Sequence, residues 1–363
     1  MHVWTPSRLC LFGEHLDYHR LEVVTMAIDL RFYATISKRE DTIARIEIRD
    51  ENRNDRSAVF CYNLAEELVY HSARDYFKSS FNVMKKHGVA FPHGFDIRMD
   101  SNIPIGKGMS SSSAMIVALI KAVLEMSDTD IRNDRDAIAQ LAYEAEVLEF
   151  REPGGKMDHL ASVHGGICHF DFSDMNHPSV KKLDIGLEGS FILFDSLEKK
   201  DTIRVLANAK EPVLRALERL GTRDIRWLAT NPEAMGRMGK LPDEDRVPLM
   251  ATLDNYAIVR EFMEGTGNGT MSPERLGGLL WRHHGNLRDG LGISTPKIER
   301  ILSVAMENGA YGGKINGSGG GGCCFAYVSA SRGEAVRKAV EKMGFPAIPL
   351  KLSEGLTARE VQA

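Results

Sequence analysis

The stretch that constrains the fold most reads Pro104-Ile105-Gly106-Lys107-Gly108-Met109-Ser110-Ser111-Ser112-Ser113-Ala114, here called the Gly/Ser loop. Two glycines let the backbone bend close to a ligand, and the serines open an apolar segment with helical periodicity. A helix N-terminus presents unpaired N–H groups and a partial positive charge, which suit a phosphate. Lys107 adds a cation, and the hydroxyls can reach a metal ion carried by that phosphate. The stretch therefore predicts a phosphate-binding loop, with a turn that merely caps a helix as the alternative.

Two common phosphate-binding patterns are missing from the sequence. No Gly-x4-Gly-Lys-Ser/Thr occurs, so the Gly/Ser loop is not a Walker A loop. The protein-kinase set of Val-Ala-Ile-Lys, His-Arg-Asp and Asp-Phe-Gly is missing as well. The Gly/Ser loop therefore fits neither of these two patterns.

Length and composition indicate a cytoplasmic enzyme. The 363 residues are enough for two domains that share a cleft, and 43% hydrophobic and 26% charged residues are ordinary for a globular protein. A net charge of −4 and a pI near 6.3 predict no binding to nucleic acid or anionic membrane. No apolar run is long enough to span a membrane, and residues 1–12 lack a signal-peptide core. Five cysteines, an odd number, favour reduced thiols over disulfides or a zinc site.

Hydrophobic periodicity predicts an α+β fold, because strands come first and mixed elements follow. Strands are expected at 23–28, 33–38, 44–49, 95–99, 166–172, 191–194 and 323–329. Helices are expected at 112–126, 135–149, 202–220, 253–263 and 334–343. We also expect a loop or hairpin tip at 49–56, a helical excursion with exposed loops at 221–250, and a domain boundary within 173–190.

The N-terminal segment Gly13-Glu14-His15-Leu16-Asp17-Tyr18 follows an apolar strand. Carboxylates, an imidazole and a phenol beside a glycine suit a polyhydroxylated ligand, because carboxylates accept hydrogen bonds from sugar hydroxyls. The alternative is a solvated loop. His15 and His19 have a spacing that could bind metal on a helix, but helix signals are poor here and no third ligand is evident.

A second chemical segment runs from Glu146 to Gly155-Lys156-Met157-Asp158-His159. Pro153-Gly154-Gly155 breaks one helix and starts another, which places Asp158 in a first turn, where the helix dipole favours the ionised carboxylate. A carboxylate kept ionised beside an arginine can orient a substrate hydroxyl and accept its proton. The alternative role for Asp158 is helix capping.

The last Gly-rich loop reads Gly312-Gly313-Lys314-Ile315-Asn316-Gly317-Ser318-Gly319-Gly320-Gly321-Gly322. It contains a literal Gly-x-Gly-x-x-Gly, but it runs into an expected strand at 323–329 rather than opening a helix. A Rossmann fold is therefore not predicted. The glycines instead predict a backbone in close approach to a ligand or to another loop.

Taken in order, these motifs resemble those of the GHMP kinases, and most closely the galactokinase-type sugar kinases. The resemblance spans nearly the whole chain, with 199–250 as its weakest part. The matching elements are Arg8 with the Gly13–Tyr18 segment, the Gly/Ser loop, Gly155-x-Met157-Asp158, Leu287-Arg288-Asp289 with Ser294–Glu299, and the last Gly-rich loop.

The resemblance implies a two-domain fold of mixed sheets and helices, divided into residues 1–175 and 176–363, with the active site in the cleft between the domains. It implies ATP and Mg²⁺ as cofactors and a small-molecule sugar as substrate; the oligomeric state stays open. The implied catalytic residues are Asp158 and Arg8. The implied substrate-binding residues are Glu14, His15, Asp17 and Gly155. The implied nucleotide-binding residues are Gly106, Lys107, Gly108, Ser110, Ser111, Ser112, Ser318 and Gly319, and the implied metal ligands are Ser112 and Glu146.

Two stretches depart from the galactokinase pattern, at 195–204 and 246–262. The substrate therefore stays open among galactose, arabinose, galacturonic or glucuronic acid and other sugars, with the anomeric hydroxyl as the expected acceptor. Two further functions remain as alternatives. One is a kinase of a non-sugar alcohol such as mevalonate, which Glu14-His15-x-Asp17 disfavours. The other is a catalytically silent sensor of sugar and ATP.

Overall fold

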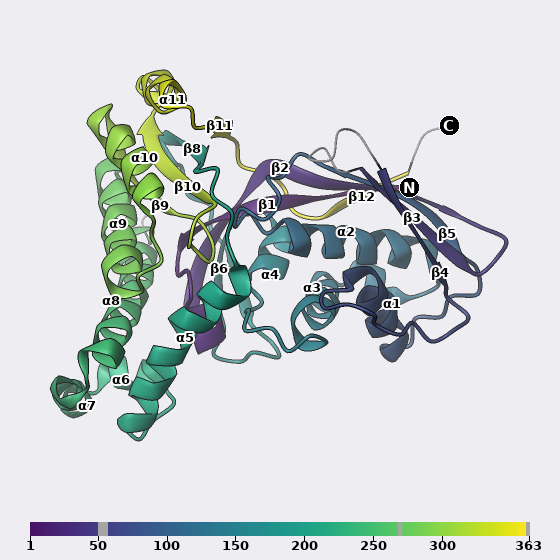
Figure 1. The fold of residues 1–363 in the computed structure, drawn as a ribbon, viewed down its shortest axis with the longest axis horizontal. Coiled ribbons are helices and arrows are strands. Elements are labelled where there is room, and N and C mark those ends of the chain that lie inside the picture. Colours follow the sequence, from purple (N-terminus) through teal and green to yellow (C-terminus); the bar gives the residue numbers. More distant parts are fainter. Residues whose placement is uncertain (50–56, 268–270, 361–363) are drawn as a thin grey trace.

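A computed structural model describes residues 1–49, 57–267 and 271–360. Its strands form two sheets, one of eight strands and one of four (Figure 1). The larger sheet has the order β12-β1-β2-β5-β3-β4, with β6 paired to β2 and β7 paired to β6. Its strands are β1 (His2–Phe12), β2 (Glu22–Lys38), β3 (Ile43–Arg49), β4 (Ser57–Asn63), β5 (Phe95–Ser101), β6 (Ile167–Asp171), β7 (Ser179–Lys182) and β12 (Thr357–Arg359).

The smaller sheet has the order β11-β8-β10-β9, and all its pairs are antiparallel. Its strands are β8 (Gly189–Asp195), β9 (Ala310–Ile315), β10 (Cys323–Ser329) and β11 (Ala347–Leu350). In the larger sheet β3 and β5 run parallel, so that sheet is mixed. The expected α+β class with mixed sheets is confirmed. The division into domains at residue 175 stays a prediction.

One group of helices covers one side of the larger sheet, and the last three helices of a second group pack against the smaller sheet (Figure 1). The first group is α1 (Tyr76–Lys86), α2 (Ser111–Met126), α3 (Arg135–Tyr143) and α4 (Met157–His164). The second group is α5 (Thr202–Arg219), α6 (Ile225–Thr230), α7 (Pro232–Arg237), α8 (Asp243–Gly265), α9 (Pro273–Gly285), α10 (Pro296–Glu307) and α11 (Gly333–Lys342). No helix in the described part of the chain is long and apolar enough to cross a membrane.

The two strands expected at 23–28 and 33–38 are one strand, β2. This prediction of a break was wrong because β2 changes partners along its length: β6 pairs with its first residues and β5 with its last. β1 pairs with the part between Val24 and Thr35, with register shifts at Pro6/Ser7 and Cys10/Phe12. The apolar pattern weakens where the partners change, but the backbone stays extended.

The helix expected at 135–149 is α-helical only as far as Tyr143. A π-helical turn, Glu144–Leu148, continues it and carries Glu146. Such turns insert an extra residue per turn and are frequent at functional sites. The helix expected at 253–263 is longer than predicted, because α8 begins at Asp243. The loop or hairpin tip expected at 49–56 falls almost entirely outside the described residues.

Candidate active site

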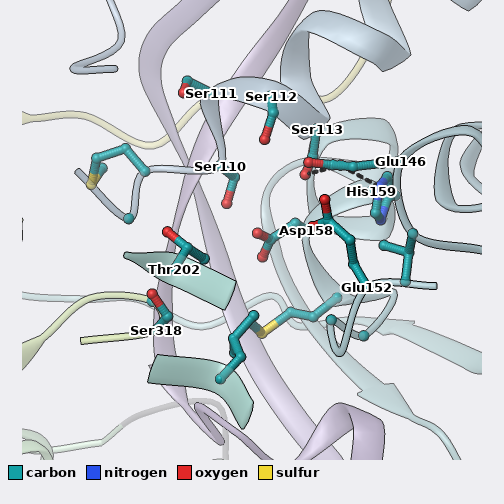
Figure 2. Close-up of a pocket in the computed structure, with 18 of the residues that line it drawn as sticks. Ser110, Ser111, Ser112, Ser113, Glu146, Glu152, Asp158, His159, Thr202 and Ser318 are labelled. Carbon is teal, nitrogen blue, oxygen red and sulfur yellow. Dashed lines mark hydrogen bonds and ion pairs between the residues drawn. The ribbon is translucent and has the colours of Figure 1, made fainter. Parts of the chain in front are cut away.

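A cavity of about 310 Å³ brings together all four segments that carry chemistry in the sequence. Its walls come from the loop after β1, the Gly/Ser loop, the π-helical turn, the start of α4, the connection from β8 to α5 and the last Gly-rich loop. In Figure 2, Ser110, Asp158 and Glu146 surround the cavity, with Thr202 and Ser318 on another side. Of the predicted site residues, Lys107 and Gly319 do not line it.

The Gly/Ser loop enters the cavity through left-handed backbone conformations. Gly106 and Gly108 have φ values of 68° and 82°, and Ser110 has a φ of 53°. α2 begins at Ser111, and no side chain caps its N-terminus. The N–H groups of the first helical turn are therefore left to bind an anion. The structure confirms that the loop opens a helix; its contact with phosphate stays a prediction.

Asp158 lies in the first turn of α4 and is held by Arg8 of β1. The Arg8 Nε and Nη2 atoms lie 2.8 and 2.7 Å from Asp158 Oδ1, and Nη1 donates to the Gly108 carbonyl at 3.1 Å. Burial favours the neutral acid, but the Arg8 charge, the Ser110 hydroxyl and His159 together outweigh burial and hold the pKa of Asp158 below its ordinary value. Arg8 is 2% exposed, so water screens the pair little. The result is an ionised carboxylate whose Oδ2 is not occupied by Arg8.

Asp17 is the second carboxylate of the cavity and depends on Gly155. Its Oδ2 accepts a hydrogen bond from the Met157 N–H at 3.2 Å. A Cβ at residue 155 would lie 1.9 Å from that same oxygen, so only glycine leaves room for Asp17 in this position. Burial, reinforced by the negative charge of Asp158, raises the pKa of Asp17 to about 6. The sequence singled out both residues, but their contact is a finding of the structure.

Glu14 contacts Lys314, a buried lysine for which the sequence predicted no role. Its Oε1 forms an ion pair with Lys314, and both side chains are fully buried. Lys314 also donates to the carbonyls of Cys10 at 3.0 Å and Ile315 at 2.9 Å, so all three of its N–H groups are used. No spacing signal marks Lys314, because its partner Glu14 lies 300 residues away. Lys314 orients Glu14 at the wall of the cavity.

His15 joins the N-terminal segment to the last Gly-rich loop. Its Nδ1 lies 2.6 Å from the Tyr18 hydroxyl and its Nε2 lies 3.2 Å from the Ser318 carbonyl oxygen. A carbonyl only accepts, so Nε2 carries the proton and the Tyr18 hydroxyl donates to Nδ1. Burial lowers the pKa of His15 to about 4, which keeps the ring neutral. Both ring nitrogens are thus engaged by the protein, whereas its predicted role is to bind sugar hydroxyls.

Glu146 is positioned by a short hydrogen-bond network, drawn with dashed lines in Figure 2. Its Oε2 accepts from the Ser113 hydroxyl at 2.6 Å and from His159 Nε2 at 2.7 Å. Burial raises its pKa, but His159 and the hydroxyls of Ser112 and Ser113 outweigh burial and keep the pKa below its ordinary value. Glu146 is therefore a fixed, ionised carboxylate beside the Gly/Ser loop.

The Ser112 and Glu146 pair fits the chemistry of Mg²⁺. Within residues 1–49, 57–267 and 271–360, no three His, Cys, Asp or Glu side chains gather in a way that could hold a metal ion. Mg²⁺ does not need such a group, because it is usually bound by one or two carboxylates together with substrate phosphates and water. A single ionised carboxylate next to a phosphate-binding helix end meets that requirement.

The lysine that lines the cavity is not the one that the sequence suggested. Lys107 of the Gly/Ser loop points away from the cavity, because its Nζ pairs with Asp195 Oδ1 at 3.0 Å and donates to the Glu198 carbonyl at 3.3 Å. Lys107 is thus paired with Asp195 in this structure, and its contact with phosphate stays a prediction. Lys200 lines the cavity instead, and its Nζ donates to the Ser318 hydroxyl at 2.8 Å. It lies in a stretch that departs from the galactokinase pattern, so no motif pointed to it.

Three family models match separate parts of the chain. The model of the GHMP kinases N terminal domain matches residues 69–166, and that of the GHMP kinases C terminal matches residues 269–345. The galactokinase galactose-binding signature matches residues 2–38, which include Arg8 and the Gly13–Tyr18 segment.

Relatives and solved structures match over nearly the whole length. A mevalonate kinase of Thermococcus onnurineus is 27% identical, over 98% of this chain and 97% of its own. A galactokinase of Streptomyces coelicolor is 28% identical, over 96% and 90%. The crystal structure of Lactococcus lactis galactokinase complexed with galactose superimposes with a TM-score of 0.80 at 20% identity, over 98% of this chain and 94% of that one. Likeness at this identity shows that the fold is shared.

Proposed function

This chain belongs to the GHMP kinase superfamily and is a small-molecule kinase, and we propose that it transfers the γ-phosphate of ATP to a hydroxyl of a monosaccharide. The observation that carries this proposal is the Arg8–Asp158 ion pair, set in one cavity with the uncapped N-terminus of α2. The ion pair provides an ionised proton acceptor, and the N–H groups at the start of α2 can bind phosphate.

Asp158 acts as the proton acceptor in this proposal. The acceptor hydroxyl binds next to Asp158 Oδ2, which orients its oxygen toward the γ-phosphate and takes its proton as the new bond to phosphorus forms. The bond between the γ-phosphorus and the β–γ bridging oxygen breaks in the same step, and ADP leaves. Arg8 keeps the carboxylate ionised before transfer. Little covalent chemistry is asked of the protein, because positioning and charge neutralisation dominate phosphoryl transfer.

The phosphates bind at the Gly/Ser loop. N–H groups around Gly106 to Ser112 surround the phosphate oxygens, and Ser318 of the last Gly-rich loop closes the other side. Mg²⁺, when bound, neutralises phosphate charge, and Ser112 and Glu146 are the residues that would hold it.

The acceptor is a sugar in this proposal, and its anomeric hydroxyl is the one phosphorylated. Asp17 and Glu14 supply carboxylate oxygens for sugar hydroxyls, with Gly155 making the room that Asp17 needs. The match of residues 2–38 to a galactose-binding signature supports a sugar over other alcohols. The five free cysteines are compatible with a reaction in the cytoplasm.

Phosphorylation of a non-sugar alcohol is the second candidate. A mevalonate kinase matches the chain at 27% identity over nearly its full length, which is as close as the galactokinase relative. The overall identity therefore does not choose between the two acceptors, and the choice rests on the N-terminal segment.

An assay of ADP release across a panel of monosaccharides, uronic acids, sugar phosphates and mevalonate tests the proposal. We expect sugar-dependent release that Asp158→Asn strongly reduces, with ³¹P and ¹H NMR placing the phosphate on the oxygen of the anomeric carbon. Release with mevalonate alone would establish the second candidate. A phosphate on another sugar carbon would refute the anomeric assignment only.

A further inference from the structure

We propose that Lys200 is a further catalytic residue, whose ammonium group contacts the γ-phosphate during transfer. The inference rests on the proposed function, because it needs ATP at the Gly/Ser loop. Lys200 lies in the connection between β8 and α5, outside every motif recognised in the sequence.

The first argument is the position of Lys200 between the two Gly-rich loops. Its Nζ donates to the hydroxyl of Ser318 in the last Gly-rich loop at 2.8 Å. A Cβ built on Gly108 of the Gly/Ser loop would lie 2.6 Å from the same Nζ, so the ammonium group also packs directly against that loop. An ammonium group has three N–H donors, and the bond to Ser318 uses one. The remaining donors lie where a phosphate bound to both loops would present its oxygens.

The second argument is the engagement of the other cations near the cavity. All three guanidinium nitrogens of Arg8 are already in contact with Asp158 or with the Gly108 carbonyl. Arg74 binds Glu152 through Nε at 2.7 Å and Nη2 at 3.1 Å. Lys107 is paired with Asp195 and faces away. Lys200 forms no ion pair with any carboxylate of the described residues, although it lines the cavity.

The third argument is the energetic cost of that arrangement. Burial, with a further contribution from the positive charge of Arg8, lowers the pKa of Lys200 to about 8, while Asp158 and Cys323 oppose the shift. A half-buried cation without a carboxylate partner is less well stabilised in the free protein than a paired one. A bound phosphate would supply the missing negative charge, so a ligand is the partner that the arrangement lacks.

The alternative is a purely structural lysine that fixes Ser318 and the last Gly-rich loop. The two roles differ in what they do to nucleotide affinity. A contact with the γ-phosphate affects ATP and spares ADP, whereas a loop-fixing role affects both nucleotides alike.

Calorimetric titrations with Mg²⁺ and either a non-hydrolysable ATP analogue or ADP test the inference. For Lys200→Met we expect affinity for the ATP analogue to fall about 10- to 100-fold, the usual range for losing a charge-assisted hydrogen bond, and affinity for ADP to change less than about threefold. Lys200→Arg should keep most of the preference for the ATP analogue, because it keeps the charge. Lys199→Met is the matched control, because Lys199 is the neighbouring lysine and its side chain is exposed. This variant should bind both nucleotides as wild type does.

Equal losses for the two nucleotides, or no loss in Lys200→Met, would overturn the inference and leave the proposed function intact. If Lys200→Met does not fold, Lys200→Gln compared with Lys200→Arg makes the same measurement. A wild-type protein that binds neither nucleotide would overturn the proposed function and this inference with it.

Discussion

The two Gly-rich loops have similar compositions, but Gly106 of the Gly/Ser loop and the glycines of the last Gly-rich loop serve different purposes. A Cβ on Gly106 of the Gly/Ser loop would meet no atom within 4 Å. Glycine is therefore favoured at this position by its left-handed φ and not by close packing. In the last Gly-rich loop, a Cβ on Gly317 would lie 2.6 Å from the Gly108 carbonyl oxygen, and one on Gly322 would lie 2.4 Å from the Lys107 carbonyl oxygen. There the glycines let one loop pack its backbone directly against the other.

This difference separates a binding loop from a supporting loop. The Gly/Ser loop leaves its hydroxyls and helix N–H groups facing the cavity. The last Gly-rich loop and the start of β10 donate hydrogen bonds to the Gly/Ser loop. The Cys323 N–H donates to the Lys107 carbonyl at 2.8 Å, and Asn316 Nδ2 donates to the Gly108 carbonyl at 3.1 Å. Substitutions at the cavity should therefore reduce turnover, and substitutions between the loops should reduce stability.

The largest expected effect is a loss of turnover when Asp158, the carboxylate beside the Gly/Ser loop, is substituted. Asp158→Asn should lower kcat by about 10²- to 10⁴-fold, the range for losing a positioned proton acceptor. Some stability should be lost too, because buried Arg8 loses its counter-charge, so folding is checked by circular dichroism. The control is Asp195→Asn, which removes the partner of Lys107 outside the cavity and should cost less than about tenfold. Near-normal turnover in folded Asp158→Asn would remove Asp158 from the mechanism.

The comparison of the loops is tested directly by a pair of alanine substitutions. Gly322 and Gly106 have similar φ values of 79° and 68°, so alanine suffers the same backbone strain at both, about 1 to 2 kcal/mol. Only Gly322→Ala also collides with a backbone carbonyl, so it should lower the free energy of unfolding by about 4 kcal/mol in total. Urea denaturation of the two variants measures the difference. Equal losses would mean that the second loop does not depend on close packing.

Asp17 lies on neither Gly-rich loop, and its burial at the cavity wall makes the stability of the protein depend on pH. Its folded-state pKa of about 6 is above the ordinary value for aspartate, so protonation favours the folded protein. Stability that is present below about pH 4 is therefore lost as the pH rises through 6, by up to about 3 kcal/mol. Asn does not titrate, so Asp17→Asn should gain stability over wild type between pH 4 and pH 8, while KM for the sugar rises. A stability difference that is independent of pH in urea titrations would contradict this account.

The smallest expected effect is at the metal-facing side of the Gly/Ser loop. Ser112→Ala should raise the Mg²⁺ concentration for half-maximal activity by about tenfold, while KM for the sugar stays unchanged. Ser303→Ala changes an exposed serine of α10 outside the cavity and should leave the Mg²⁺ titration as in wild type. An unchanged titration in Ser112→Ala would shift the role to Ser111 or Ser113.

Local signals in the sequence determined much of the fold and the chemistry. Glycine and proline at 153–155 predict a helix start before Asp158, and α4 begins at Met157. The run of serines predicts the start of α2 within one residue. The last Gly-rich loop runs into β10, as its apolar residues predict. These features depend on neighbours in the chain, which is why they can be predicted from the sequence.

Partners across long sequence separations were decided only by the tertiary structure. The sequence pointed to Lys107 as the cation of the phosphate site, but packing turns Lys107 toward Asp195 and brings Lys200 to Ser318. It likewise could not show that Glu14 would meet Lys314, or that Gly155 leaves room for Asp17. Both Gly-rich loops look alike as sequences, because glycine content reports backbone freedom and not what lies beside it. The neighbours are set by how two sheets and their helices pack, and that packing depends on the whole chain at once.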